Sequence, residues 1–306
     1  MRERAVAILG LGLIGGSIGR GLAGLTRRLG YDPDPEARRL AVEGGAVDES
    51  HPEPGPWLGE ASMVLLAAPA GALPELAARA APWLAPDAVV TDVAGAKARV
   101  AAALAPLLPP GRYVPGHPMA GSEHSGGRYA EAGLFRDAVW FLCPPPGLQA
   151  GGGAEAEGES AWRRVAALVE RLGARPRRIS AEEHDRWVAR TSHLPYLVAA
   201  ALAEVAAEED PAEIRQAVAG GFRDTTRVVG MDPGVGAGMC LSNRDQLLHA
   251  LDRFHAALDR LEEALRQDRA EEMSALLARA REARAVLLEA GGGERESPVS
   301  AGGELR

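Results

Sequence analysis

An apolar run that leads directly into closely spaced glycines constrains the fold of this chain more than any other feature. Residues 5–9 are apolar, and Gly10, Gly12 and Gly15 follow them before a helix-like pattern begins. Between a strand and a helix, this G-x-G-x-x-G spacing allows a tight turn, lets the backbone approach a pyrophosphate and packs the helix on the strand. The N–H groups and the dipole of the helix then face the anion. We therefore predict that a dinucleotide contacts Gly10, Gly12, Leu13, Ile14 and Gly15.

Because the chain holds 37 glycines, an ordinary glycine turn is the alternative, and a second feature is needed. Asp32 supplies it, because it follows a predicted second strand about 20 positions after the motif, where an acidic residue can bind a ribose 2′-hydroxyl. A carboxylate there repels a 2′-phosphate, and no arginine follows before Arg38, so we expect NAD rather than NADP. The other interpretation is that Asp32 only begins the turn at residues 32–35.

Composition sets the broad class of the protein. The 306 residues leave room for about two domains, and 46% hydrophobic residues can fill their cores. No apolar segment approaches the roughly 20 residues that span a bilayer, and residues 1–4 lead straight into a strand, so we expect a soluble, cytoplasmic protein. Cys143 and Cys240 are too few for a disulfide framework or a thiolate metal site, and we expect no metal. The net charge of −8 argues against a nucleic-acid partner.

Apolar and β-branched runs alternate with helical patterns through the first half of the chain. The runs span residues 62–67, 88–93, 112–114 and 138–143. Strands that alternate with helices predict a parallel sheet whose ligand lies beyond the carboxyl ends of the strands. The segments that should open onto one crevice are Ala68-Pro69, Asp92 to Lys97 and Gly116 to Gly126. We count Ala68, Pro69 and Asp92 among the cofactor contacts.

The pattern of predicted elements changes near residue 180. Residues 144–160 are rich in Pro, Gly and Glu, which predicts a surface loop, and a helix at 162–172 and a strand at 174–179 should close the first domain. Only helical patterns follow. The predicted fold is therefore an α/β Rossmann-type dinucleotide-binding domain over residues 1–179, followed by an all-α helical domain over residues 180–290.

Two features define the first helix of the second half. Ser180 and Glu183 have the spacing of a capping box, so a helix should begin there and run toward Glu208. Pro195 lies inside this pattern and should kink the helix, which frees a backbone carbonyl near Thr191.

A later helix carries apolar residues at alternating steps of four and three, which is the spacing of an a/d seam. The seam packs either within the helical domain or in a homodimer, and the spacing does not distinguish them. A last helix is expected at residues 270–289, and residues 291–306 are expected to be a disordered tail. The seam residues are Leu247, Leu251, Phe254, Leu258, Leu261 and Leu265.

His117 is the strongest candidate for acid–base chemistry. Its loop, residues 116–126, contains few packing residues and follows a predicted strand on the crevice side of the sheet. A histidine near a nicotinamide can act as a general base, because its pKa lies close to the operating pH. Taken alone, a histidine in a loop is more often a surface residue.

Seven motifs, in order and in both halves, resemble the prephenate dehydrogenase family of tyrosine biosynthesis. The resemblance spans about residues 5–245. It implies an NAD-binding domain and an all-helical domain that forms a homodimer, with prephenate bound between them; arogenate is the alternative substrate. The motifs are Gly10 to Ser17, Thr91-Asp92-Val93, His117 to Glu123, Glu183-His184-Asp185, Ser192 to Pro195, Gly220 to Arg227 and Asp232-Pro233.

The resemblance also implies roles for single residues. His117 resembles the catalytic histidine that engages the ring hydroxyl, His193 a histidine of the substrate pocket, and Arg227 the arginine that binds a substrate carboxylate. Arg223 is a weaker candidate for the same task. A planar, permanently charged guanidinium suits a dianionic substrate in a chain of net negative charge. The implied reaction is oxidative decarboxylation of prephenate to 4-hydroxyphenylpyruvate.

Two positions depart from the pattern of the family. Gly95 stands where a serine usually partners the catalytic histidine, so water or Ser122 is expected to replace it, and Ser122 is also counted among the substrate contacts. Gly236 stands where the family has a tryptophan, so part of the pocket wall should differ. Lys97, the only lysine of the chain, fits the pattern and should hold the loop or position a phosphate.

Two other functions remain open at this point. The β-hydroxyacid dehydrogenases also join a glycine-loop domain to a helical one, but they rely on a lysine in the helical domain, and Lys97 lies in the first. A dinucleotide-binding sensor without catalytic activity is the third interpretation.

Overall fold

The computed structural model describes residues 3–122, 124–146, 153–208 and 210–289. They belong to two compact units, residues 1–250 and 251–306. The predicted domain boundary at residue 179 falls inside the first unit, because the helices that follow it pack with the nucleotide-binding part.

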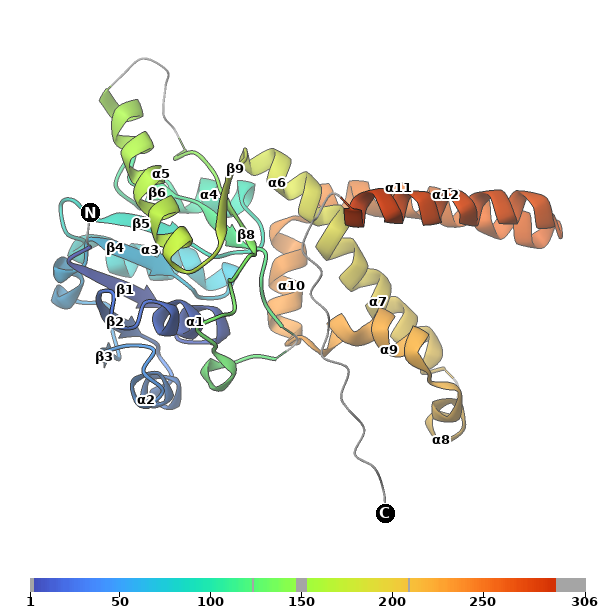
Figure 1. Ribbon diagram of the computed structural model, residues 1–306, viewed down its shortest axis with the longest axis horizontal. Helices are drawn as coiled ribbons and strands as arrows, with labels where there is room; N and C mark the ends of the chain where they lie inside the picture. The colour runs from blue at the N-terminus through green and yellow to red at the C-terminus, as the bar shows by residue number, and fades with distance from the viewer. Residues whose placement is uncertain (1–2, 123, 147–152, 209, 290–306) are drawn as a thin grey trace. The chain divides into compact units, whose positions relative to one another are not determined.

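The first unit is built on a six-stranded parallel sheet with the strand order β3-β2-β1-β4-β5-β6 (Figure 1). This is the order of Rossmann-type dinucleotide-binding folds, so the predicted fold class is confirmed. The strand β3 was not predicted, because three half-buried residues do not form an apolar run. The strands are β1 (Ala5–Leu9), β2 (Arg27–Tyr31), β3 (Glu49–His51), β4 (Met63–Leu66), β5 (Val89–Asp92) and β6 (Tyr113–Val114).

Helices cover both faces of this sheet. Val6 and Ile8 of β1 pack into one core, with α1 (Leu13–Gly21) and α5 (Gly153–Arg171). Ala7 and Leu9 point to the opposite core, which contains α3 (Leu73–Ala80) and α4 (Ala98–Leu104). Burial on both faces explains why β1 is a continuous apolar run. The helix α2 (Pro35–Glu43) lies between β2 and β3 in the chain.

A second, three-stranded sheet corrects the predicted place of residues 138–143. These residues form β8 (Val139–Leu142), which pairs antiparallel with β7 (Gly116–Pro118) and parallel with β9 (Arg175–Arg178), outside the large sheet. His117 therefore lies on a strand, opposite Phe141, and not in a loop as predicted. A strand of three residues is too short to show an alternating pattern.

The predicted surface loop at residues 144–160 is also wrong in its second half. The helix α5 begins at Gly153, nine residues before the expected start at Trp162. Alanine and glutamate, both good helix formers, outweigh the glycines in this stretch.

The helical half of the first unit begins as predicted. The Ser180 hydroxyl accepts a hydrogen bond from the Glu183 backbone N–H at 3.1 Å, which caps α6 (Ala181–Val188). A π-helical segment, Ala189–His193, then separates α6 from α7 (Leu194–Ala206), so the break expected at Pro195 is confirmed. Next come α8 (Pro211–Ile214), α9 (Gly220–Thr226) and α10 (Pro233–Ser242).

Two long helices end the described chain, α11 (Arg244–Arg266) and α12 (Ala270–Glu289), as predicted. Along the a/d seam of α11, Leu247 is buried, whereas Leu258 and Leu265 expose 48% and 72% of their surface. The predicted tail at residues 291–306 lies outside the described residues. None of the described helices is long and apolar enough to cross a bilayer.

Candidate active site

The glycine loop between β1 and α1 has the geometry of a dinucleotide site. Gly10 has φ of +108°, and a side chain there would collide with the Ala67 carbonyl; one at Gly15 would collide with the Gly10 carbonyl. A Cβ at Gly12, in contrast, would meet no atom within 4 Å. No side chain caps the start of α1, where Leu13 and Ile14 are half-buried. The open space at Gly12 and the free N–H groups of α1 fit a pyrophosphate.

Asp32 lies directly beside this loop, although 21 positions separate it from Leu11. Its Oδ2 accepts a hydrogen bond from the Leu11 backbone N–H at 2.8 Å, and its Oδ1 accepts one from the Asp34 backbone N–H at 3.0 Å. The second contact is the turn considered as the alternative role, so the turn and the place beside the loop coexist. The Arg38 guanidinium donates to the Asp32 carbonyl at 2.7 Å.

The other expected cofactor contacts have different surroundings. Ala68 is half-buried and Pro69 exposed, just after the carboxyl end of β4. Asp92, at the end of β5, is fully buried, and its carboxylate accepts from the Lys97 ammonium, the Tyr113 hydroxyl and the Ala94 backbone N–H. These bonds occupy the Asp92 side chain, and the cofactor contact of Asp92 stays a prediction.

Lys97 is fully buried and ties the large sheet to the strand that carries His117. Its Nζ lies 2.5 Å from Asp92 Oδ1 and 2.5 Å from the Gly116 carbonyl. A buried ion pair is tolerated when further hydrogen bonds satisfy both charges, and here the Tyr113 hydroxyl donates to Asp92 at 2.8 Å. Burial, followed by the Asp92 charge, raises the pKa of Tyr113 well above its usual value. Of the two roles expected for Lys97, the geometry supports holding the loop.

Beyond Lys97, three histidines gather from two parts of the chain; we call His117, His184 and His193 the histidine cluster. His117 Nδ1 lies 2.8 Å from His184 Nε2, and His184 Nδ1 lies 2.8 Å from Asp185 Oδ1. The His117 side chain is half-buried, whereas His184 and Asp185 are buried. Phe141, opposite His117 on β8, packs edge-on against the His184 ring.

The hydrogen bonds determine which nitrogens carry protons. The Asp185 carboxylate only accepts, so His184 Nδ1–H donates to it. A neutral His184 then has a lone pair on Nε2, which accepts from His117 Nδ1–H. A neutral His117 therefore presents an unprotonated Nε2, which is the form that a general base requires.

Burial keeps these rings neutral. It lowers the pKa of His117 well below 6.5, and the neighbouring His184, Lys97 and His193 lower it further. The pKa of His184 is also lowered by burial, although the hydrogen bond to Asp185 acts in the opposite direction.

Asp185 is itself held by the nucleotide-binding part. Its two oxygens accept from the backbone N–H groups of Lys97 at 2.7 Å and Ala98 at 2.9 Å, at the start of α4. These groups are orphan donors at a helix N-terminus, and no side chain of α4 itself caps them. Asp185 thus fixes α6 to α4 and orients His184 at the same time.

His193 joins the cluster from the π-helical segment and is fully buried. Its Nδ1 lies 3.1 Å from Asn243 Nδ2, and its Nε2 has no hydrogen-bond partner among the described residues. Burial lowers its pKa to about 4, while the Asp185 charge and the Gly95 backbone act to raise it.

The two departures from the family pattern are resolved differently. A Cβ at Gly95 would lie 3.8 Å from His117 Nε2 and 3.8 Å from Met239 Cγ, so a serine there would fit beside the imidazole. Among the described residues, His184 is the hydrogen-bond partner of His117, at Nδ1; Ser122, one of the two replacements expected beside water, makes no hydrogen bond to it. Ser122 is exposed, and its hydroxyl accepts from the His124 backbone N–H at 3.2 Å.

At Gly236, the aromatic ring of Tyr196 occupies the space of the missing side chain. A Cβ at Gly236 would collide with the hydroxyl and the ring of Tyr196. The half-buried Tyr196 lies three residues after His193, at the start of α7. An aromatic side chain is thus supplied from another helix.

The two arginines expected to bind substrate lie on elements that pack against α7. Arg223 belongs to α9 and Arg227 to the short 3-10 helix that follows, and both side chains are exposed. Both elements pack on α7, which begins directly after His193. Binding of a carboxylate by Arg227 or Arg223 stays a prediction.

Sequence reasoning missed His184, Asp185 and Asn243. The available signal was an adjacent histidine and aspartate about one helical turn after the Ser180 cap, in a motif that had no assigned chemistry. Adjacent polar residues on a helix usually face water, and only the packing of α6 on α4 buries both.

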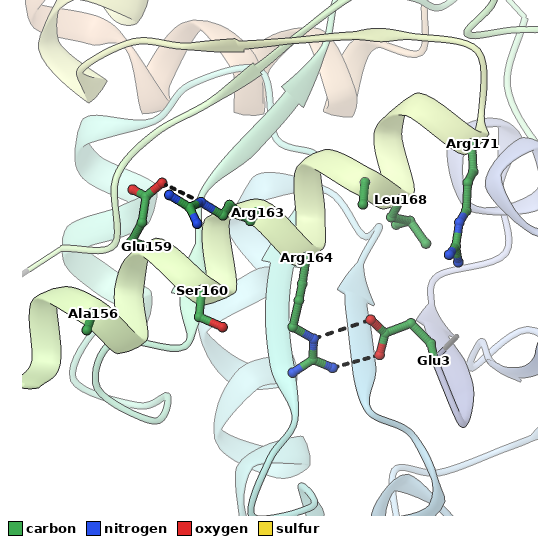
Figure 2. A pocket seen from close by; sticks show the side chains of 9 residues that line it. Glu3, Ala156, Glu159, Ser160, Arg163, Arg164, Leu168 and Arg171 are labelled. Carbon is green, nitrogen blue, oxygen red and sulfur yellow. Dashed lines mark hydrogen bonds and ion pairs between the residues drawn. The ribbon is translucent and has the colours of Figure 1, made fainter. Parts of the chain in front are cut away.

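A separate cavity of about 440 Å³ lies along α5 and shares no residue with the cluster. Its wall carries an ion pair between Arg164 and Glu3, 2.6 Å apart, and a second one between Arg163 and Glu159 (Figure 2). Because these charges neutralise each other within the wall, the cavity does not compete with the histidine cluster as the site of chemistry.

Comparison with known proteins identifies the family. The family model described as prephenate dehydrogenase, nucleotide-binding domain, matches residues 24–175, and the one described as its dimerization domain matches residues 180–279. Cyclohexadienyl dehydrogenase of Zymomonas mobilis is 34% identical over 85% of this chain and 88% of its own length.

Solved structures agree with this match. A prephenate dehydrogenase of Aquifex aeolicus, in complex with hydroxyphenyl propionate and NAD+, superposes with a TM-score of 0.84 at 28% identity, over 93% of this chain and 98% of its own. An arogenate dehydrogenase of Synechocystis gives a TM-score of 0.74 at 30% identity, over 92% and 99%. The chain therefore belongs to the prephenate dehydrogenase family of oxidoreductases.

Proposed function

We propose that this protein catalyses the NAD-dependent oxidative decarboxylation of prephenate to 4-hydroxyphenylpyruvate, a step of tyrosine biosynthesis. The observation that carries the proposal is the unprotonated Nε2 of His117, which the hydrogen bonds through His184 to Asp185 maintain. Such a base is what the reaction requires, since the ring hydroxyl at C4 must lose its proton.

In this mechanism His117 Nε2 takes the proton of the C4 hydroxyl. When bound, NAD would supply the oxidant for the hydride at C4; the ring carboxylate leaves as carbon dioxide, and the proton held on His117 returns to the phenolate oxygen of the product. The positive charge that forms on His117 spreads to His184 through the Nδ1–H bond, and the Asp185 carboxylate stabilises it. The aromatic ring that forms makes the step favourable.

Other residues would bind NAD and the substrate. The glycine loop, the start of α1 and Asp32 would hold the pyrophosphate and ribose of NAD, with Ala68 and Pro69 at the next strand end. Arg227 would bind the side-chain carboxylate of the substrate, with Arg223 as a second cation and Ser122 as a polar contact.

Arogenate is the second candidate substrate. The proposal for prephenate rests on the Aquifex aeolicus relative, but a relative of similar identity is an arogenate dehydrogenase. Arogenate carries an alanyl group in place of the pyruvyl group, so the two substrates differ in an ammonium that the pocket must pair or reject.

We also propose that the protein is a cytoplasmic homodimer. The family model of the helical part is a dimerization domain, and Leu258 and Leu265 of the α11 seam are exposed in the single chain. A second copy would cover these side chains. Light scattering that gives the mass of a dimer would support this, whereas a monomer would contradict it.

A substrate panel tests the activity directly. Prephenate and arogenate are each mixed with NAD and with NADP, and NADH or NADPH is followed by absorbance. We expect reduction with prephenate and NAD. Preference for arogenate would select the second substrate, and NAD binding with no turnover of either compound would favour a dinucleotide sensor.

A further inference from the structure

The second face of the cluster, where Asn243 meets His193, has no role in the mechanism so far. Asn243 is buried, and its Nδ2 lies 2.8 Å from the Asp185 carbonyl and 3.1 Å from His193 Nδ1. A carbonyl only accepts hydrogen bonds, so the atom of Asn243 that faces it must be the amide nitrogen. This settles the orientation of the amide by chemistry.

The remaining N–H of that amide points to His193. Because it can only donate, His193 Nδ1 must be the acceptor and carries no proton. His193 is neutral at pH 7, since burial lowers its pKa to about 4. Its single proton is therefore on Nε2, the atom without a partner among the described residues.

This arrangement is the reverse of the one at His117. Asp185 acts on both rings: its carboxylate, through His184, leaves His117 with a free lone pair on Nε2, and its carbonyl, through Asn243, leaves His193 with a proton on Nε2. Both rings border Gly95: its Cβ position is 3.8 Å from His117 Nε2, and its backbone raises the pKa of His193, as a carbonyl that faces a ring N–H does.

We propose that Asn243 is a positioning residue that fixes His193 as an N–H donor, so that Asp185 holds the two histidines of the site in opposite tautomers. One ring then accepts a proton and the other donates a hydrogen bond to an oxygen of the substrate. The catalytic consequence rests on the proposed function, whereas the tautomers themselves belong to the free protein.

Nitrogen NMR of the imidazole rings in the free protein tests the tautomers without any substrate. The chain has only seven histidines, and His193→Gln identifies the signals of His193 by their loss. At neutral pH we expect the proton of His193 on Nε2 and that of His117 on Nδ1. A His193 proton on Nδ1, or two protons on the ring, would overturn the proposal.

Asn243→Asp tests the consequence. A carboxylate beside Nδ1 accepts a hydrogen bond, so at pH 8.5 the proton of His193 should move to Nδ1, as in histidines that are held by an aspartate. Loss of a hydrogen bond to a charged substrate should then raise KM for prephenate by about 10- to 100-fold, with a smaller change in kcat.

At lower pH the same aspartate favours the imidazolium, which again carries a proton on Nε2, so the KM defect should shrink; a purely structural defect would not recover. Asp245→Asn is the matched control, an exposed carboxylate-to-amide exchange two residues away that should leave KM unchanged. An unchanged His193 tautomer and KM in Asn243→Asp would contradict the proposal, and if that variant does not fold, the spectrum of the natural protein decides.

The test separates this inference from the proposed function. Opposite tautomers without turnover of prephenate or arogenate would leave the positioning role intact and remove the proposed reaction. Turnover with both histidines in the same tautomer would support the proposed reaction and remove the positioning role of Asn243.

Discussion

The glycine loop and the histidine cluster are built in opposite ways. The loop uses backbone groups of residues 10–15, consecutive in the chain, and its side chains matter mainly by their absence. The histidine cluster uses side chains of residues 117–193, and the hydrogen bonds that Asp185 and Asn243 make around it cross up to 88 positions. A cofactor common to many proteins can be bound by a local backbone motif, whereas the chemistry of one substrate needs side chains that tertiary packing brings together.

Lys97 joins the end of β5 to the strand that carries His117, and its removal should have the largest effect. In Lys97→Met the Asp92 carboxylate remains buried without its partner, which should cost about 3–5 kcal/mol of unfolding free energy. Urea denaturation measures it. The double variant with Asp92→Asn should recover part of the loss, and a single-variant cost below about 1 kcal/mol would show that the pair does not hold β5 to the strand of His117.

Removing the base should abolish most of the catalytic function of the histidine cluster and leave NAD binding by the glycine loop unchanged. We expect His117→Ala to lower kcat by roughly 100-fold or more with little change in KM and with unchanged affinity for NAD. Steady-state kinetics and calorimetry with NAD provide the two readouts. His249→Ala, an exposed histidine of α11, is the control. Turnover that survives in His117→Ala would exclude this imidazole as the base.

Replacing glycine by alanine at two positions of the loop should distinguish the glycine that makes room for the ligand from the glycine that is needed for packing. Gly12→Ala meets no atom within 4 Å in the free protein, so the melting temperature should hold while Kd for NAD rises by about 10-fold. Gly15→Ala collides with the Gly10 carbonyl, so it should lower the melting temperature and also raise Kd for NAD. Equal NAD affinity in Gly12→Ala and the natural protein would place the pyrophosphate elsewhere.

As the pH falls, the buried histidines should lower the free energy of unfolding before the carboxyl groups do. Burial lowers the pKa of His193 to about 4, so between pH 6.5 and 5.5 the unfolded chain binds more protons than the folded one. The contribution of neutral His193 to the free energy of unfolding is fully present above pH 6.5. Its partial loss should lower the free energy of unfolding by about 1 kcal/mol between pH 6.5 and 5.5.

The carboxyl groups whose pKa is lowered by arginine partners, such as Asp48 and Asp87, lose their contribution only at lower pH. Thermal melts at pH 6.5 and 5.5 measure the difference, and His193→Gln should reduce it. A melting temperature that does not change over this range would mean that the cluster is already protonated or open to water.

The sequence predicted the loop better than the cluster for a physical reason. The β1–α1 motif, the capping box at Ser180 and the break at Pro195 depend on contacts within a few residues, and each is found where expected. The strand β7 and the start of α5 were missed, because one is too short for a pattern and the other is masked by glycines. Asp92 was assigned to the cofactor by its place at a strand end, whereas burial commits it to Lys97.

By itself, the sequence determined the fold class and the place of the glycine loop, since spacing along the chain encodes local backbone geometry, and it singled out His117 as a candidate base. Only the tertiary structure decided the partner of His117, the burial of Asp92 and Lys97, and the hydrogen bonds that lead from Asp185 through His184 to His117 and through Asn243 to His193. The proton positions in an imidazole pair depend on distances of a few ångströms between residues dozens of positions apart. Those distances exist only once α6 has packed against α4.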